Sequence, residues 1–172
     1  MPYDLLKPPA PSSRIKDGRL QIDFDNFLPF SLTAISNRIA RTASRTYLRC
    51  FGIGINEWRT IANLRVWPGT TANLICQRSG LDKAAVSRSL KLLEDAGMVC
   101  TNSDSGDMRG RSMKLTAKGD ELHDKVIQTA LEREACLLTG FTPLERAQLL
   151  SFVTRLNKNI PLLQQDKDCE PG

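Results

Sequence analysis

The stretch TTANLICQRSGLDKAAVSRSLKLLEDAG, residues 70–97, decides how this chain is interpreted. It contains two short amphipathic segments, at about 72–79 and 83–96, joined by Ser-Gly-Leu-Asp. Gly80 suits a sharp turn, because glycine adopts positive φ without steric cost. Cys76 is small enough for the second segment to cross the first there, and Val86 supplies an apolar anchor after the turn. The stretch therefore predicts a helix-turn-helix.

The second helix of this pair has a clear start and two different faces. Asp82 is a favoured N-cap residue, and Leu81 and Val86 stand at the two positions of a hydrophobic staple. A stripe formed by Val86, Leu90 and Leu93 is expected to face the core. The opposite face presents small and basic side chains, namely Lys83, Ala84, Ser87, Arg88 and Lys91. This face suits a helix in the major groove of DNA, although taken alone it is equally consistent with an ordinary solvated surface.

A β-hairpin is expected directly after this helix, from extended stretches at 98–101 and 112–115 with a polar, glycine-containing segment between them. In that position the hairpin is a wing. Arg109 at its tip is expected to enter a minor groove, whose negative potential attracts guanidinium groups, and Asp107 to orient an arginine. In isolation the tip is better explained as a solvated turn. The complete set of expected DNA contacts is Thr71, Lys83, Ala84, Ser87, Arg88, Lys91, Asp107, Arg109 and Arg111.

Helical periodicity continues on both sides of this central unit, so the fold class is mainly α, a winged helix-turn-helix with long flanking helices. Thr116 is a good N-cap, and Thr142-Pro-Leu-Glu145 has the pattern of a capping box with proline at the first helical position. We expect a flexible N-terminal arm at 1–22, dimerisation helices at 23–54 and 116–163, a winged helix-turn-helix domain at 55–115, and a frayed tail at 164–172.

Charge and cysteine content narrow the class of protein. The 172 residues carry a net charge of +5, and the first two thirds of the chain hold the positive excess, which permits a nucleic-acid partner. Five cysteines without a CxxC pair suggest reduced thiols in a cytoplasmic protein. A single histidine makes a zinc site hard to build, and we expect neither a metal nor a cofactor. The sequence shows no signal peptide, and no apolar run approaches the ~20 residues of a membrane span.

The chain resembles the MarR (multiple antibiotic resistance regulator) family of bacterial transcription factors. The resemblance covers about residues 25–160 and is carried by the recognition helix, by Asp107-Met-Arg109, and by Leu115-Thr-Ala-Lys-Gly119 six residues after the arginine. It implies an obligate homodimer whose first and last two helices interlock. It also implies binding to a pseudo-palindromic operator in double-stranded DNA, usually as a repressor, and often release by a phenolic or other aromatic ligand.

The resemblance also implies a ligand crevice between the dimer helices and the winged domain, which in this chain would be lined by Asn37, Arg41, Arg45 and Trp58. Arginine would bind a carboxylate or phosphate, and tryptophan would form an aromatic wall. Core packing of Trp58 and a solvated or DNA-facing role for the arginines are the plainer interpretations. The resemblance is strongest to members that control the catabolism of aromatic compounds, whose ligands include hydroxycinnamoyl-CoA thioesters.

Three other functions have weaker support in the sequence. A thiol-based redox sensor has little support, since no cysteine lies near the start of the first helix. A winged-helix module that binds protein instead of DNA is disfavoured by the basic recognition face. An enzyme is not expected, because the sequence has one histidine, no glycine-rich phosphate loop and no nucleophile motif.

Overall fold

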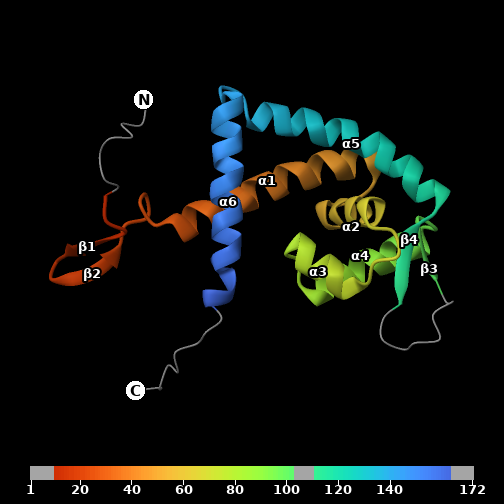
Figure 1. Ribbon diagram of the computed structural model, residues 1–172, viewed down its shortest axis with the longest axis horizontal. Helices are drawn as coiled ribbons and strands as arrows, with labels where there is room; N and C mark the ends of the chain where they lie inside the picture. Colours follow the sequence, from red (N-terminus) through yellow and green to blue (C-terminus); the bar gives the residue numbers. More distant parts are fainter. Residues whose placement is uncertain (1–9, 103–110, 164–172) are drawn as a thin grey trace, which may run out of the picture. The chain divides into compact units, whose positions relative to one another are not determined.

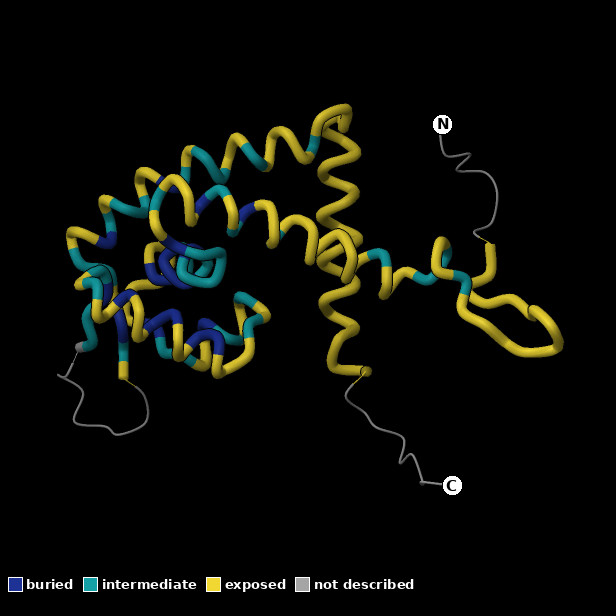
Figure 2. The backbone as a smooth tube through the Cα atoms, turned by 180° about the vertical axis from the view of Figure 1, so that it is seen from behind, coloured by how far each residue is buried: buried dark blue, intermediate teal, exposed yellow. Residues whose placement is uncertain are grey.

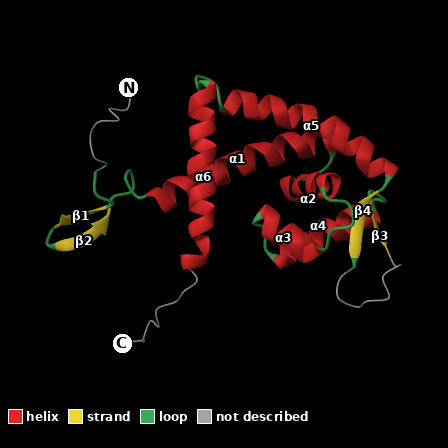
Figure 3. Ribbon diagram, in the orientation of Figure 1, coloured by secondary structure: helices red, strands yellow, loops and turns green. Residues whose placement is uncertain are grey.

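The computed structural model describes residues 10–102 and 111–163 of the chain. It divides into two compact units with the boundary after Val126, within the fifth helix. The elements are drawn in Figures 1 and 3 and run, in chain order, β1 (Ser13–Lys16), β2 (Arg19–Ile22), α1 (Leu28–Phe51), α2 (Ile55–Val66), α3 (Ala72–Ser79), α4 (Lys83–Asp95), β3 (Val99–Asn102), β4 (Ser112–Leu115), α5 (Ala117–Leu137) and α6 (Pro143–Leu163). The expected fold class, a mainly α winged helix-turn-helix with long flanking helices, is confirmed.

The core of the first unit lies among α2, α3, α4 and the sheet formed by β3 and β4, where the buried residues gather in Figure 2. The stripe expected on α4 is buried as predicted, with Val86, Leu90 and Leu93 exposed by 0%, 7% and 1%. Other helices contribute further fully buried side chains, namely Ile61, Leu64, Ile75 and Val126. Burial of each such side chain contributes about 1.5–3 kcal/mol, so the stripe fixes which face of α4 points outward.

The turn between α3 and α4 forms as the sequence predicts. Gly80 ends α3 in the left-handed conformation with φ of 67°, and its N–H donates to the carbonyl of Cys76 at 2.9 Å. Asp82 then caps α4, because its Oδ1 accepts the N–H of Ala85 at 2.7 Å. These two local devices set the start of α4 independently of the distant core.

The wing strands β3 and β4 are antiparallel, with Val99 opposite Leu115 and Asn102 opposite Ser112. The chain before α3 joins this sheet through a bridge between Thr70 and Met113, in which the N–H of Met113 donates to the carbonyl of Thr70 at 2.9 Å. Pro68 and Gly69 make residues 67–70 a break between helices. Their carbonyls and amides also attach the helix-turn-helix to the wing.

The first turn of α5 packs directly on the backbone at the start of the wing. Thr116 Oγ1 accepts the N–H of Gly119 at 3.2 Å, which confirms Thr116 as the N-cap, and the N–H of Thr116 donates to the carbonyl of Met98 at 3.0 Å. Gly119 is buried, and a Cβ atom placed on it would lie 2.1 Å from the carbonyl oxygen of Met98. Only glycine therefore allows the helix to approach the wing this closely.

The segment before α1 differs from the flexible arm that composition suggested. Residues 13–22 form a hairpin with the register Ser13 to Ile22 and Ile15 to Leu20. Asp17 and Gly18 both have positive φ, at 53° and 72°. Two consecutive residues of positive φ are typical of the tight turn that Asp-Gly favours between antiparallel strands. This local signal outweighs the prolines that precede it.

The second unit contains the end of α5 and α6. The predicted capping box at the start of α6 is confirmed, since the N–H of Thr142 donates to Glu145 Oε2 at 2.7 Å and the N–H of Glu145 donates to Thr142 Oγ1 at 3.3 Å. The bonds from Thr142 lower the pKa of Glu145, so this cap stabilises the helix above the ordinary glutamate pKa and loses that effect as the pH falls through the lowered value. The sequence predicts that α6 ends near Asn159, before Pro161, but the helix continues through Pro161 to Leu163.

Candidate DNA-binding site

The outward face of α4 carries all the recognition-helix residues that the sequence predicted. The five side chains of Lys83, Ala84, Ser87, Arg88 and Lys91 are exposed. Three of them are cationic at neutral pH, and the small alanine and serine between them leave room for close approach of another molecule. The structure thus brings these residues together on one helix face, directly opposite the buried stripe.

A groove of about 620 Å³ runs between α4, the start of α3 and the wing. Four predicted DNA contacts line it, namely Thr71, Ser87, Lys91 and Arg111. Glu94 and Asp95 also line this groove, and Glu94 Oε1 accepts a hydrogen bond from Thr101 Oγ1 at 2.6 Å. One carboxylate is therefore engaged in holding β3 against α4. The predicted residues Asp107 and Arg109 lie outside the described residues.

Glu57 positions α4 from its buried side and was not among the predicted site residues. One carboxylate oxygen accepts the N–H of Gly54 at 2.9 Å at the start of α2. The other accepts the hydroxyl of Ser89 at 2.8 Å, across 32 positions of sequence. Ser89 is only 1% exposed. This bond fixes α4 relative to the N-terminus of α2, and no sequence spacing reveals a contact between residues so far apart.

Two serines on α4 give a matched test of this arrangement. Replacing Ser89 with alanine is expected to lower the free energy of unfolding by about 1–3 kcal/mol, because a half-buried carboxylate oxygen of Glu57 loses its partner. The same change at Ser87, which is exposed, should leave stability within about 0.5 kcal/mol of the original. Urea denaturation of both variants measures the difference. Equal stability of the two would mean that the Glu57–Ser89 bond does not hold α4.

A second device orders the chain that leads into α3. The guanidinium carbon of Arg78 lies 4.1 Å from the centre of the Trp67 ring, and its Nη1 donates to Thr70 Oγ1 at 3.2 Å. A cation over a tryptophan face contributes about 0.5–1 kcal/mol at an exposed site. Arg78 thereby ties the last turn of α3 to the segment that bridges to the wing. The arginine was not among the predicted site residues.

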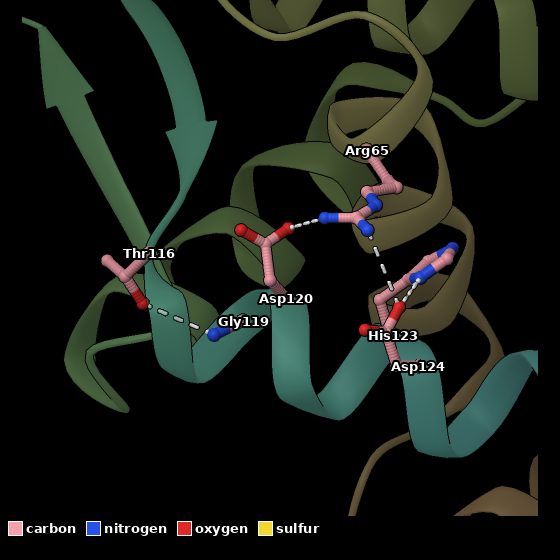
Figure 4. Close-up of polar contacts among 6 residues, drawn as sticks. All are labelled: Arg65, Thr116, Gly119, Asp120, His123 and Asp124. Carbon is pink, nitrogen blue, oxygen red and sulfur yellow. Dashed lines mark hydrogen bonds and ion pairs between the residues drawn. The ribbon is translucent and has the colours of Figure 1, made fainter.

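A polar cluster joins α2 to the first turns of α5, as Figure 4 shows. Arg65 reaches from α2 to Asp120 at 2.6 Å and to Asp124 at 3.6 Å. The hydrogen bond from His123 Nδ1, together with the nearby charge of Arg65, lowers the pKa of Asp124. His123 also stacks on Trp58 with ring centres 5.6 Å apart. This cluster and the close contact at Gly119 hold the start of α5 to the winged unit.

The residues predicted to bind a ligand have two kinds of environment. Asn37, Arg41 and Arg45 are exposed and follow one another at four-residue spacing along α1. Trp58 is 9% exposed and packs between His123 and Tyr47, whose ring centre lies 6.0 Å away. The contacts of Trp58 are those of a core residue. A shared ligand crevice formed by these four residues stays a prediction.

Taken together, a helix-turn-helix with an exposed basic second helix and an antiparallel wing define a DNA-binding protein of the winged-helix class. Residues 51–110 match the model of the MarR family. A MarR/EmrR family transcriptional regulator from Acinetobacter sp. ADP1 has a crystal structure that matches with 33% identity and a TM-score of 0.78, over 82% of this chain and 99% of that one. The chain belongs to the MarR family of transcriptional regulators.

Two further solved structures share the fold. MepR of S. aureus, solved in complex with DNA, matches with 22% identity and a TM-score of 0.66, over 77% of this chain and 95% of that one. CouR of Rhodococcus jostii RHA1, solved with p-coumaroyl-CoA bound, matches with 15% identity and a TM-score of 0.69, over 78% of this chain and 94% of that one. Within the described residues, no helix is long and apolar enough to span a membrane.

Proposed function

We propose that this protein is a sequence-specific repressor that binds a pseudo-palindromic operator as a homodimer. The observation that carries the proposal is the exposed face of α4, on which Arg88 and Lys91 stand opposite the buried stripe and beside the wing. Arginine recognises guanine edges in the major groove, and lysine and serine bind phosphates. MepR, which has this fold, has been solved in complex with DNA, and that supports the same use of the fold here.

The dimer is supported by apolar surface that the single chain leaves exposed. On α1 these side chains recur at three- and four-residue steps and include Leu28, Leu32, Ile35 and Ile39. On α6 no residue is buried, and the exposed apolar side chains are Leu144, Leu149, Leu150, Phe152, Val153, Leu156, Ile160, Leu162 and Leu163. Surfaces of this kind are typical of protein–protein interfaces. A two-fold dimer would place two recognition helices about 34 Å apart, which is one turn of DNA.

A ligand that releases the operator is the finer part of the proposal. CouR binds a CoA thioester of an aromatic acid, and the exposed Arg41 and Arg45 of this chain are suited to a phosphate or carboxylate. A ligand changes DNA affinity only through its differential affinity for the two states of the protein. The test adds p-coumaroyl-CoA, or the free aromatic acid, to the protein–operator complex. Release that is lost in Arg41→Ala supports this ligand class, and undisturbed binding contradicts it.

The proposed function is tested by titrating the protein against a duplex of its own upstream intergenic DNA, at two salt concentrations, with random duplex as competitor. We expect tight binding that weakens as salt rises and survives the competitor. If the protein binds this duplex, and the duplexes of a genomic library, no more tightly than random DNA, it is not a sequence-specific regulator. It would favour the winged-helix protein-interaction module.

The wing is tested with Arg111→Ala. Arg111 is exposed and lines the groove beside α4, where a phosphate contact is expected. Loss of one phosphate contact in each subunit, two in the dimer, should weaken binding to operator and random duplexes alike, and the slope of log affinity against log salt should fall by about 2. A slope equal to that of the original protein would remove Arg111 from the contacts. We expect the same behaviour of Arg109, which lies outside the described residues.

A further inference from the structure

The hairpin of β1 and β2 has two faces of different chemistry. Side chains alternate along a strand, and cross-strand partners share a face. The register therefore defines an apolar face, consisting of Ser13, Ile15, Leu20 and Ile22, and a basic face, consisting of Arg14, Lys16, Arg19 and Gln21. Three positive charges thus lie on one side of a ribbon whose other side carries three branched aliphatic side chains.

The apolar face is uncovered in the single chain. Ile15 and Leu20, which are cross-strand partners, are 77% and 76% exposed, and Ile22 is 41% exposed. A two-stranded ribbon on its own is at best marginally stable in water, and covering its apolar side chains would stabilise it. The charged side chains of the basic face are well solvated as they stand. The apolar face, and not the basic one, is therefore the side that requires a partner.

A packed linker joins the hairpin to α1. The N–H of Asp23 donates to the carbonyl of Ser12 at 3.0 Å and closes the base of the hairpin. Phe30, in the first turn of α1, contacts the ring of Phe24 at 4.8 Å between centres and the ring of Phe27 at 5.0 Å. These contacts restrict how far the hairpin can turn away from the start of α1.

Along the chain, the apolar face of the hairpin is followed by the exposed apolar residues of α1 that are proposed to form the dimer. Phe24, 68% exposed, lies in the sequence between the hairpin and Leu28, Leu32 and Ile35, which are 50%, 42% and 51% exposed. Charge on the adjoining helix also favours a second copy of the chain as the partner. Helix α1 holds four basic and no acidic side chains, whereas residues 116–172 hold seven and nine. The basic α1 of one copy and the acidic C-terminal third of another are complementary.

We propose that the β1–β2 hairpin is a dimerisation arm, whose apolar face packs on a second copy of this chain while its basic face stays outward. The inference rests on the proposed dimer and adds to it an interface element outside the helices. It identifies Ile15 and Leu20 as the residues that contact the other copy.

The occupant of the apolar face is identified by photo-crosslinking of the full chain. A benzophenone amino acid is placed at position 20 on the apolar face, or as a control at the neighbouring position 21 on the basic face. After illumination without DNA, the probe at position 20 should give a covalent dimer on a denaturing gel, and the probe at position 21 should not. Crosslinking only within the same chain would overturn the proposed dimerisation arm. In a second sample, to which an operator duplex is added before illumination, crosslinking to the duplex and not to a second copy would also overturn it.

The contribution of the arm is measured as the dissociation constant of the dimer, by sedimentation on dilution. The double variant Ile15→Ser/Leu20→Ser should raise this dissociation constant about a hundredfold. Both apolar contacts are lost in each of the two hairpins, and each hairpin accounts for about tenfold. The matched control Arg14→Ser/Gln21→Ser, on the basic face of the same strands, should change it by no more than about twofold. Equal constants for the two variants would overturn the arm while leaving the dimer intact. A wild-type protein that is monomeric at every concentration would instead overturn the proposed dimer itself, and with it the arm.

Discussion

Replacing Gly119 with alanine is expected to destabilise the protein by about 1–3 kcal/mol or more, because the new methyl group would lie 2.1 Å from the carbonyl oxygen of Met98. The atom in the way belongs to the backbone, so no side-chain rotation relieves the clash. Inside most helices the same change is stabilising by roughly 0.5–1 kcal/mol. The direction of the effect therefore distinguishes a close approach from an ordinary helical glycine.

Thermal and urea unfolding of Gly119→Ala measure this effect, with Glu121→Ala as the control, since Glu121 is an exposed residue of the same helix. Operator affinity should fall with Gly119→Ala, because the wing strands are attached at this point through the bond from Thr116 to Met98. A variant more stable than the original would show that α5 does not pack on the start of the wing.

Arg88→Ala is expected to abolish most of the preference for the operator while leaving the dimer and the fold unchanged. Arg88 is exposed on α4, so its removal costs no buried contact, and a good arginine–guanine pair is worth about 1–3 kcal/mol of discrimination. In a symmetric dimer the loss occurs twice. The ratio of operator to random-duplex affinity should therefore fall by a factor of about 30 to more than a thousand.

The matched control is Arg155→Ala, which removes the same charge from an exposed position of α6. It should leave the ratio of operator to random-duplex affinity unchanged. Competition titration with both duplexes gives the ratio for each variant. If Arg88→Ala selected its operator as well as the original protein does, α4 would not be the helix that reads the base edges.

Local signals in the sequence account for most of the secondary structure. Helix α3 and strand β4 occupy the residue ranges that were expected, because the turn residue Gly80 borders the first and the cap residue Thr116 borders the second. The buried stripe of α4 follows from its period. The continuation of α6 through Pro161 was not predicted, because proline usually ends a helix. It is tolerated here because proline in the last turn removes only one hydrogen bond, at an end that is already weakly held.

Long-range contacts in the site were not predictable from one sequence. In the sequence, Glu57 looks like an ordinary acidic residue in the first turn of α2. Its hydrogen bond with Ser89 forms only because α2 and α4 pack together. The position of Gly119 was noted for its resemblance to a family motif, yet the reason for glycine there is the carbonyl of Met98, which no spacing reveals. The N-terminal hairpin is the opposite case. Its Asp17-Gly18 turn and alternating side chains were local signals, outweighed in the sequence analysis by the prolines nearby.

The two tryptophans of this chain are placed so that fluorescence can report on two different events. Trp67 is 43% exposed beneath the Arg78 guanidinium, in the segment that leads into the DNA-facing helices. Trp58 is nearly inaccessible and stacks on His123 in the core. A Trp58→Phe variant therefore yields a spectroscopic signal from the DNA side alone, and a Trp67→Phe variant one from the interior. Operator engagement and changes in the core become separately observable in the same protein, without an added label.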